Sequence, residues 1–379
     1  MESNYINSIK NILSKRTLPD SPASFLQSSS QVMIYGAGNC GKDVLSVLTQ
    51  QGIPVTGFLD SKMPAGTYVN GVPVLRPDDK AIERDRRSDV CLIIAIFNAF
   101  TDIVPIIREL KSYGYTNIIT FLDFYRHYPD ALGDRFWLTS TKLYDSLEAL
   151  LAEGLSVWHD EQSRALYKAI LEFRCTGNYE ILPRPETEKQ YFDKNLPRWR
   201  TPLELIDCGS YEGDTLVDLK NMYGTVSTIV AFEPDPLNFI QLGRMVESSD
   251  TPFADKIILY PCGVWSSTTQ LQFDSSAASS HVSATGALQV QCVSLDEALH
   301  NIAPTLIKMD IEGAEYEALL GARRMITKHK PGLAICVYHR PEHLWQIPLM
   351  LRQWSLGYKF YLRAYCYAGF DVVLYAVNE

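Results

Sequence analysis

Two segments of the chain share one pattern, in which a short apolar run leads into closely spaced glycines and then into an amphipathic stretch. The first reads QVMIYGAGNCGKDVLSVLTQQG from Gln31, and the second reads LELIDCGSYEGDTLVDLKNM from Leu203. Such a pattern predicts a buried strand, a tight turn and a helix, the unit from which parallel sheets covered by helices are built. Since the two units lie far apart, we expect an α/β protein with two separate Rossmann-like sheets.

The length and composition agree with that expectation. At 379 residues, the chain exceeds one ordinary core, and its 46% hydrophobic and 21% charged residues are typical of a globular protein. We place a first domain at residues 1–125, a helical connector at 126–200 and a second domain at 201–379. The eight cysteines lack the close pairs of a zinc site, so we assign them no chemistry.

Charge and hydropathy restrict the partners. The net charge of -9 argues against nucleic acid, because binding to phosphates depends on Lys and Arg. The first residues lack the apolar core of a signal peptide, and the longest strongly apolar run, 90–97, is too short to cross a membrane. We therefore expect a cytoplasmic protein without a membrane span that acts on a small molecule or glycan. Assembly into a homo-oligomer stays open.

The first glycine turn has the spacing of a nucleotide-binding loop. Gly36, Gly38 and Gly41 stand in the order G-x-G-x-x-G, with Asn39 between them. This spacing allows a tight turn, close approach to a phosphate and close packing of helix on strand. Asp60 ends the next predicted strand, where an acid can accept hydrogen bonds from ribose hydroxyls. Glycines also allow a helix to pack closely on a strand without any ligand, so a nucleotide-binding loop and a purely structural turn both stay open.

Further strands are predicted at 90–97 and 117–123, with a helix at 102–113 between them. The GAGN loop and the aspartate after the second strand resemble the N-terminal domain of bacterial sugar acetyltransferases of the PglD type. The resemblance covers roughly the first third of the chain and implies a nucleotide or nucleotide-linked sugar as ligand. NAD is the alternative ligand. In the connector, Tyr191 precedes the second domain in a segment that can fold over a cofactor.

In the second unit the acid precedes the glycines. Asp207, Gly209 and Gly213 leave space for the amino-acid part of a cofactor, with the acid facing its ammonium, which favours S-adenosylmethionine over NAD. Glu233 ends the next strand, where an acid accepts hydrogen bonds from both ribose hydroxyls, and Pro234 begins the following turn. The other residues expected to line this cofactor site are Ser210, Tyr211, Thr215, Cys262, Gly263, Val264 and Asp310.

A later strand and its exit read TLIKMDIEGAEYEALLGA. The string IKMDIEGAE resembles the signature of FkbM-type methyltransferases, as do DCGSYEGDT, FEPDP, VSLDEAL, YHRPEHLWQIP and YKFYLRAYCYAGFDVVLYAV. The resemblance covers residues 203–378. It implies a seven-stranded Rossmann-like methyltransferase fold, bound S-adenosylmethionine and methyl transfer to a hydroxyl of a sugar, glycan or natural product. One departure is Phe370 and Asp371, which stand where the family has Glu-Thr.

Methyl transfer to a hydroxyl needs an aligned acceptor and a base for its proton. Asp310 ends the fourth strand near the expected methyl group, and His339 ends the fifth strand on the same rim, so either is a candidate base. Lys308 shares a strand face with Asp310 and either pairs with it, orients substrate or forms a structural salt bridge. If a metal is required, its candidate ligands are Asp310, Glu312 and His339, and the histidine favours a transition metal over magnesium.

Substrate contacts are expected from His281, His343 and Trp345, although such residues also occur at the surface or in a core. Glu312 and Glu315 open the next helix, where capping alone explains an acid. The hypotheses are an O-methyltransferase, a bifunctional protein with an NAD-dependent first domain, and a non-catalytic nucleotide-binding scaffold. No Tyr-x-x-x-Lys arrangement for redox chemistry follows the first loop.

Overall fold

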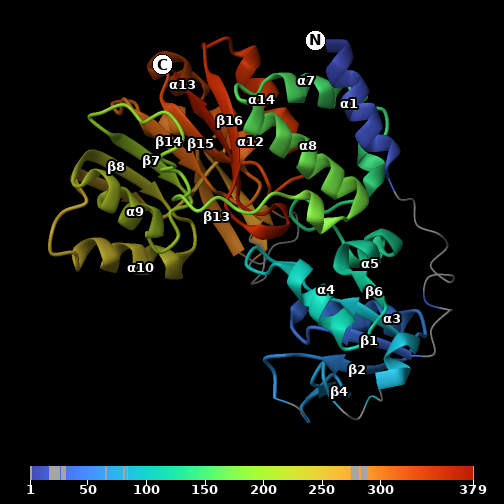
Figure 1. Ribbon diagram of the computed structural model, residues 1–379. Helices are drawn as coiled ribbons and strands as arrows, with labels where there is room; N and C mark the ends of the chain where they lie inside the picture. The colour runs from blue at the N-terminus through green and yellow to red at the C-terminus, as the bar shows by residue number, and fades with distance from the viewer. Residues whose placement is uncertain are drawn as a thin grey trace.

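The computed structural model describes residues 2–16, 26, 31–64, 66–79, 82, 84–274, 281–282 and 288–378. Its strands form a six-stranded sheet, a four-stranded sheet and a seven-stranded sheet. Figure 1 shows the six-stranded sheet in the lower part of the molecule and the seven-stranded sheet in the upper part. The predicted α/β class with two separate large sheets is confirmed.

The first sheet has the strand order β3-β4-β2-β1-β5-β6. Its parallel strands and neighbouring helices are β1 (Gln31–Tyr35), α3 (Asn39–Gln50), β2 (Val55–Leu59), β4 (Val72–Leu75), β5 (Val90–Ile94), α4 (Ile103–Ser112) and β6 (Asn117–Thr120). Sequence analysis missed β4 and its antiparallel neighbour β3 (Tyr68–Val69). Asn70 and Gly71 join the two strands, both at positive φ, and Asn-Gly between apolar runs is a strong hairpin signal.

The connector is helical up to Ile181. It contains α5 (Phe121–His127), α6 (Pro129–Leu132), η2 (Thr141–Tyr144), α7 (Glu148–Ser156), α8 (Glu161–Thr176) and η3 (Tyr179–Ile181). Helix α1 (Glu2–Ser14) packs on α7 and α8 rather than on the first sheet, as Figure 1 shows. Its apolar face, which includes Ile9 and Ile12, is buried there. The boundaries at 125 and 200 stay predictions.

The second large sheet has the order β16-β17-β15-β14-β7-β8-β9, and only β17 runs antiparallel to its neighbours. Its central strands are buried on both faces, which explains their continuous apolar sequence. The strands are β7 (Glu204–Cys208), β8 (Val226–Phe232), β9 (Ala254–Tyr260), β14 (Leu306–Met309), β15 (Gly332–Cys336), β16 (Lys359–Ala364) and β17 (Val372–Val377). The helices are α9 (Asp214–Tyr223), α10 (Pro236–Glu247), α11 (Leu295–Ala298), α12 (Glu315–Gly321), α13 (Arg323–His329) and α14 (His343–Gln353).

The predicted hairpin is present as β11 (Thr269–Asp274) and β13 (Leu288–Val293). With β10 (Gly263–Val264) and β12 (His281–Val282), it forms the four-stranded sheet. The serine-rich loop and the side chain of His281 lie outside the described residues, so the expected substrate contact of His281 stays a prediction. Within the described ranges, the helices are too short or too polar to cross a membrane.

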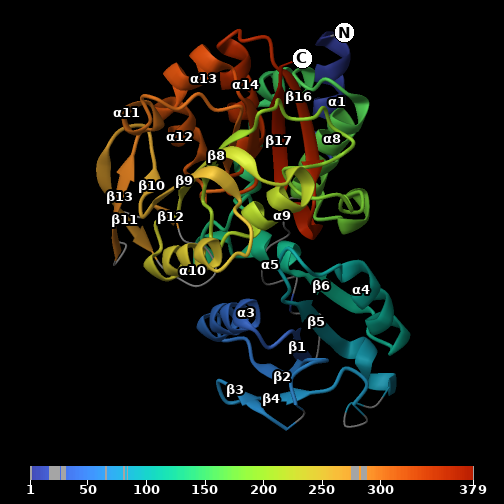
Figure 2. The ribbon, with the colours of Figure 1, turned by 90° about the vertical axis from the view of Figure 1, so that its left-hand side faces the viewer.

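The carboxyl edges of the two large sheets face one another. Phe97, which follows β5, packs on Phe370 with ring centroids 5.0 Å apart. The amide of Tyr367, in η4 (Tyr367–Gly369), donates to the carbonyl of Ala99 over 2.9 Å. The turn that contains η4 joins β16 to β17 at the carboxyl end of β16, and Figure 2 shows the seven-stranded sheet above the first domain. Since parallel sheets bind ligands at their carboxyl edges, both candidate sites lie toward the same interface.

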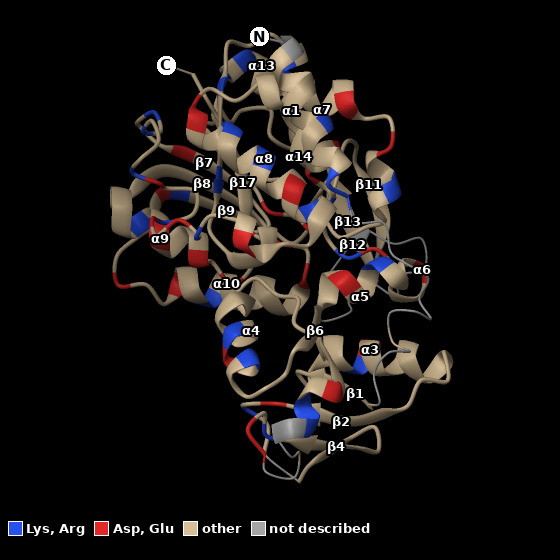
Figure 3. Cartoon of the chain, turned by 45° about the vertical axis from the view of Figure 1, so that its right-hand side comes forward, with Lys and Arg blue, Asp and Glu red and all other residues tan. Residues whose placement is uncertain are grey.

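Charged side chains of both signs are mixed on the surface. In the view of Figure 3, basic and acidic residues are interspersed on helices of both domains. Interspersed charges of both signs are typical of a solvated surface.

Candidate functional site

The loop after β7 needs glycine at two positions. Gly209 has φ of +82°, and a Cβ there would collide with the backbone oxygen of Asp310. Gly213 has φ of +97° at the start of α9, and a Cβ there would collide with the side chain of Met245. The left-handed conformation disfavours larger residues at both positions, and at Gly209 the contact with backbone, which cannot move aside as a methionine side chain can, excludes them as well. The loop is therefore held directly against the end of β14, where Asp310 stands.

Glu233 is fixed beside this loop. Its Oε2 accepts from the amide of Tyr211 at 2.8 Å, and its Oε1 accepts from the amide of Asp235 at 2.9 Å. Burial raises the pKa of Glu233, while the two amide donors oppose that rise. A carboxylate has more acceptor positions than these two bonds use, so Glu233 retains capacity for ribose hydroxyls. Pro234, half-buried, leads from it into α10.

Asp207 and Lys308 form a buried pair on neighbouring strands. Lys308 Nζ lies 3.0 Å from Asp207 Oδ1 and donates to the carbonyl of Gly209 at 2.5 Å. Of the roles left open for Lys308, the structural salt bridge is the one observed, with Asp207 instead of Asp310 as its partner, because β14 pairs with β7 so that Lys308 lies opposite Asp207. The side chain of Asp207 is fully buried, so it anchors the glycine loop through Lys308 instead of facing a cofactor ammonium directly.

Replacing Lys308 by Met is expected to destabilise the chain by about 3–5 kcal/mol, because it leaves the Asp207 carboxylate buried without its counter-ion. Urea unfolding followed by circular dichroism measures this change. Lys256, exposed on β9, provides the control, since Lys256→Met should change stability by less than about 0.5 kcal/mol. Equal stability of the two variants would contradict the structural role of the pair.

Tyr191 reaches Asp310 from the connector. Its hydroxyl donates to Asp310 Oδ2 at 2.8 Å. Its own backbone is held by Trp199, whose Nε1 donates to the Tyr191 carbonyl at 2.8 Å, and by Tyr375, whose hydroxyl accepts from the Tyr191 amide at 3.1 Å. Burial, with the nearby Asp310 carboxylate, holds the pKa of Tyr191 well above its usual value. The segment before β7 therefore does fold over the site, with Tyr191 as a fixed donor.

The structure brings Asp310, Glu312 and His339 together, as the sequence predicted. His339 Nε2 lies 3.3 Å from Asp310 Oδ1 and 3.6 Å from Glu312 Oε2, and Nδ1 lies 2.8 Å from Glu315 Oε1. Burial lowers the pKa of His339, but Glu315, Glu312 and Asp310 outweigh it and raise the pKa to about 10. The His339 side chain is only 1% exposed, whereas Asp310 is 27% exposed, so Asp310 faces the open side of the cluster.

Glu315 has a larger role than the capping assigned from sequence. It is fully buried, and its Oε1 accepts from the amide of Ile311 at 2.9 Å. Its Oε2 lies 3.3 Å from His343 Nδ1. Burial raises the pKa of Glu315, but the two histidines outweigh that effect and lower it far below the usual value. In the sequence, the only signal for this role is the spacing of Glu312 and Glu315 in DIEGAE. An acid at the start of a helix is also expected from capping alone, so the sequence does not separate the two roles.

Two expected substrate contacts were wrong. His343 is buried against Glu315, and Trp345 is buried in α14, where its ring lies 6.1 Å from that of Tyr144. Both side chains face inward because α14 packs against α7 and α12. Neither residue can meet a substrate without rearrangement of the core.

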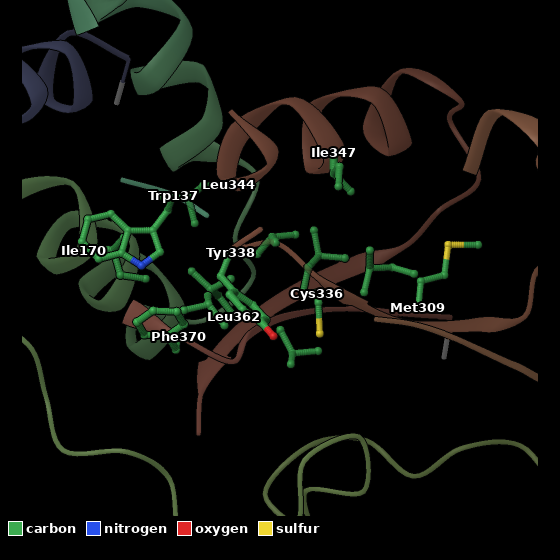
Figure 4. Packing of buried hydrophobic residues seen from close by; sticks show 14 of the residues in the cluster. Trp137, Ile170, Met309, Cys336, Tyr338, Leu344, Ile347, Leu362 and Phe370 are labelled. Carbon is green, nitrogen blue, oxygen red and sulfur yellow. The ribbon is translucent and has the colours of Figure 1, made fainter. Parts of the chain in front are cut away.

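Aromatic side chains lie beside His339, and one of them, Phe136, was missed by the sequence analysis. The ring of Phe136 lies 6.2 Å from that of His339 and 5.2 Å from that of Phe370. Tyr338 is 6.0 Å from Phe370, and Figure 4 shows the two side chains together near Leu362. Phe136 comes from the connector, so the wall next to the cluster contains residues from outside the second domain.

The remaining predicted cofactor residues lie around the same loop and the small sheet. Ser210 Oγ donates to the carbonyl of Asp207 at 3.1 Å, and Thr215 is buried in the first turn of α9. Cys262 and Val264 are buried, and a Cβ at Gly263 would lie 2.9 Å from Cys292 Sγ. Packing explains Cys262, Gly263 and Val264, and their contact with the cofactor stays a prediction.

In the first domain, the glycines have different roles. Gly36 has φ of +98°, and a Cβ at Gly41 would collide with the Gly36 carbonyl, so both serve close packing of α3 on β1. Gly38 precedes α3 without a capping side chain, and a Cβ there meets nothing within 4 Å. The amino end of α3, which begins at Asn39, is therefore open for an anion. Asp60 Oδ2 accepts from the amide of Ala37 at 3.0 Å, which ties it to the same loop.

Two family models match separate parts of the chain. Residues 207–361 match the model of the methyltransferase FkbM domain, and residues 31–101 match the model of the PglD N-terminal domain. No curated protein matches the chain in sequence at a significant level.

Among solved structures, the chain resembles methyltransferase FkbM from Methylobacillus flagellatus KT, with 22% identity over 99% of this chain and 98% of that chain and a TM-score of 0.78. Aeropyrum pernix fibrillarin in complex with S-adenosyl-L-methionine is 10% identical over 46% of this chain and 66% of that chain, with a TM-score of 0.29. TYW2 of M. jannaschii in complex with AdoMet is 12% identical over 52% of this chain and 88% of that chain, with a TM-score of 0.24. The chain therefore resembles an FkbM methyltransferase in fold over its whole length, and residues 207–361 and 31–101 match the methyltransferase FkbM domain and the PglD N-terminal domain.

Proposed function

We propose that the second domain transfers the methyl group of S-adenosylmethionine to a hydroxyl of a sugar, glycan precursor or natural product. The observation that carries this proposal is the position of Asp310, which stands against the glycine loop, accepts from Tyr191 at 2.8 Å and is partly open to solvent. Methyl transfer to an alcohol requires a nearby group that takes the hydroxyl proton. We assign that role to Asp310.

His339 acts through Asp310. Its buried ring lies behind the carboxylate, and Glu315 contacts the opposite nitrogen, so the imidazole has a fixed orientation. Tyr191 fixes the other oxygen of Asp310. We therefore describe His339 and Tyr191 as positioning residues and Asp310 as the catalytic residue.

The cofactor residues fit S-adenosylmethionine. When bound, this cofactor supplies an activated methyl group on a sulfonium. Glu233 offers acceptors for its ribose, and we assign its amino-acid part to the glycine loop from Gly209 to Gly213, which follows β7. Lys308 holds that loop through its hydrogen bond to the Gly209 carbonyl, and Asp207 pairs with Lys308.

We assign to the first domain the binding of a nucleotide-linked acceptor sugar. Two observations support this assignment: the amino end of α3 is open at Gly38, and the carboxyl edges of the two sheets meet through Phe97 and Phe370. A ligand with its phosphates at α3 would lie at the edge that faces the second domain.

Gly38→Glu should weaken nucleotide-sugar binding by about tenfold or more relative to Gly38→Gln, because a negative charge at the amino end of α3 repels phosphate. The two side chains have nearly the same size, and the open space at Gly38 accommodates either. Calorimetric titration of the full chain with nucleotide sugars and with NAD measures the effect. Binding of NAD alone would favour the redox alternative, and equal affinities of the two variants would remove α3 from the site.

The activity itself is tested by mass spectrometry. The full chain is incubated with S-adenosylmethionine and a panel of nucleotide sugars and hydroxylated small molecules, and products are searched for the mass of one added methyl group. A methylated hydroxyl supports the proposal. Methylation only at nitrogen or carbon would overturn the O-methyl assignment, and lack of S-adenosylhomocysteine binding would overturn the whole proposal.

A further inference from the structure

We propose that Asp310, Glu312 and His339 form a binding site for a divalent transition-metal cation. The site rests on the geometry of these side chains alone, whereas the role of the cation toward the acceptor rests on the proposed methyl transfer. Asp310 ends β14, Glu312 follows two residues later, and His339 follows β15, so adjacent parallel strands bring the three together at one edge.

The spacing of the donor atoms fits a common cation. Transition metals bind carboxylate oxygen and imidazole nitrogen at about 2.0–2.2 Å, which places neighbouring ligand atoms about 3.0–3.5 Å apart at octahedral or tetrahedral angles. His339 Nε2 lies 3.3 Å from Asp310 Oδ1 and 3.6 Å from Glu312 Oε2. Within the described residues, the group whose ligand atoms all lie within 4.8 Å of one another is Asp310, Glu315 and His339, so the Glu312 side chain must rotate toward Asp310 to share an ion with Asp310 and His339.

His339 provides an independent indication of a ligand. Its side chain is 1% exposed, and neither ring nitrogen makes a hydrogen bond within the part of the chain that the structure describes, although Nε2 points at two carboxylates. Nδ1 lies closer to its carboxylate, 2.8 Å from Glu315. A metal-binding histidine has this arrangement, in which a carboxylate holds one nitrogen and the other faces the ion.

The candidate ligands are themselves held in place. Tyr191 donates to the oxygen of Asp310 that faces away from His339. Glu315 is fixed by the amide of Ile311, and Glu312 has φ of +54°, a conformation that residues with a side chain adopt uncommonly. Supporting contacts of this kind orient metal ligands.

Charge and donor type select the class of ion. Three carboxylates surround one imidazole, so negative charge is in excess around His339. Magnesium prefers oxygen ligands alone, whereas a nitrogen with two carboxylates suits Mn²⁺ or Zn²⁺. Asp310 and Glu312 are partly exposed, which leaves outward positions for acceptor oxygens, and the cation would make a bound hydroxyl more acidic.

Binding of Mn²⁺ to the chelator-treated full chain tests the site. Electron paramagnetic resonance measures the concentrations of free and bound Mn²⁺ in samples that contain neither cofactor nor acceptor. Calorimetric titration with Zn²⁺ gives a second measurement of binding. We expect one ion per chain, with affinity reduced about tenfold or more in Glu312→Gln and His339→Gln. The control is Glu317→Gln, in the first turn of α12 and outside the cluster, which should bind as tightly as the unchanged chain.

The outcomes separate this inference from the proposed function. No bound Mn²⁺ or Zn²⁺ in the unchanged chain, or equal affinity in Glu312→Gln and Glu317→Gln, would overturn the metal site even if methyl transfer is found. Thermal unfolding of each variant shows whether a loss of binding reflects a loss of folding. A bound ion without any methylated product would instead contradict the proposed function and leave the metal site standing.

Discussion

Glu233→Ala is expected to weaken binding of S-adenosylhomocysteine by about 100-fold or more. The substitution removes a carboxylate that two amides hold beside the glycine loop, at 2.8 Å from Tyr211 and 2.9 Å from Asp235. Hydrogen bonds to a charged group contribute about 1.5–3 kcal/mol each, and two ribose hydroxyls would lose such a partner. Since about 1.4 kcal/mol corresponds to a factor of ten, their loss amounts to a factor of about 100 at the least.

Calorimetric titration of S-adenosylhomocysteine into the full chain measures this effect. Glu212→Ala is a suitable control, because Glu212 is an exposed acid in the same loop and should leave the affinity within about threefold. Circular dichroism shows whether the freed amides of Tyr211 and Asp235 unfold the loop region. An affinity of Glu233→Ala equal to that of Glu212→Ala would place the ribose elsewhere.

The main elements were predictable because their signals are local. Both glycine units, the parallel strands and the β11–β13 hairpin follow from runs of apolar residues and the turns that interrupt them. The β3–β4 hairpin was missed although Asn70 and Gly71 form a typical hairpin turn, since its strands are too short to show an alternation of apolar and polar residues. Helix α1 was expected with the first domain, but its apolar face packs on distant helices, which no local pattern reveals.

The part of the site that lies at the ends of the parallel strands was predictable from the sequence. Asp310, Glu312 and His339 were placed together because adjacent parallel strands end at one edge. The partner of Lys308 was not predictable, because it depends on how β14 is aligned with β7. Tyr191 and Phe136 reach the cluster from the connector, and contacts across such distances in sequence are set by tertiary packing.

The structure also narrows the roles of the two candidate bases. In the sequence, Asp310 and His339 were equivalent, since each ends a strand on the same rim. Burial separates them: His339 is enclosed between carboxylates, while Asp310 retains an open face. A group that takes a proton from an acceptor must touch it, which favours Asp310.

Asp310→Asn should therefore lower kcat by about 10²–10⁴-fold, the usual contribution of a general base, while affinity for S-adenosylhomocysteine stays within about threefold. Asparagine keeps the size of the side chain and can still accept from Tyr191, so the loop against Gly209 should remain in place. Tyr191→Phe serves as a comparison, because it keeps the Asp310 carboxylate but removes the hydrogen bond to its Oδ2. We expect a smaller loss in kcat for Tyr191→Phe than for Asp310→Asn. Turnover with the acceptor found by mass spectrometry, measured at saturating cofactor, gives both values. If Asp310→Asn retains turnover within about threefold, Asp310 is not the proton acceptor; a larger loss in Tyr191→Phe would assign that role to the tyrosine instead.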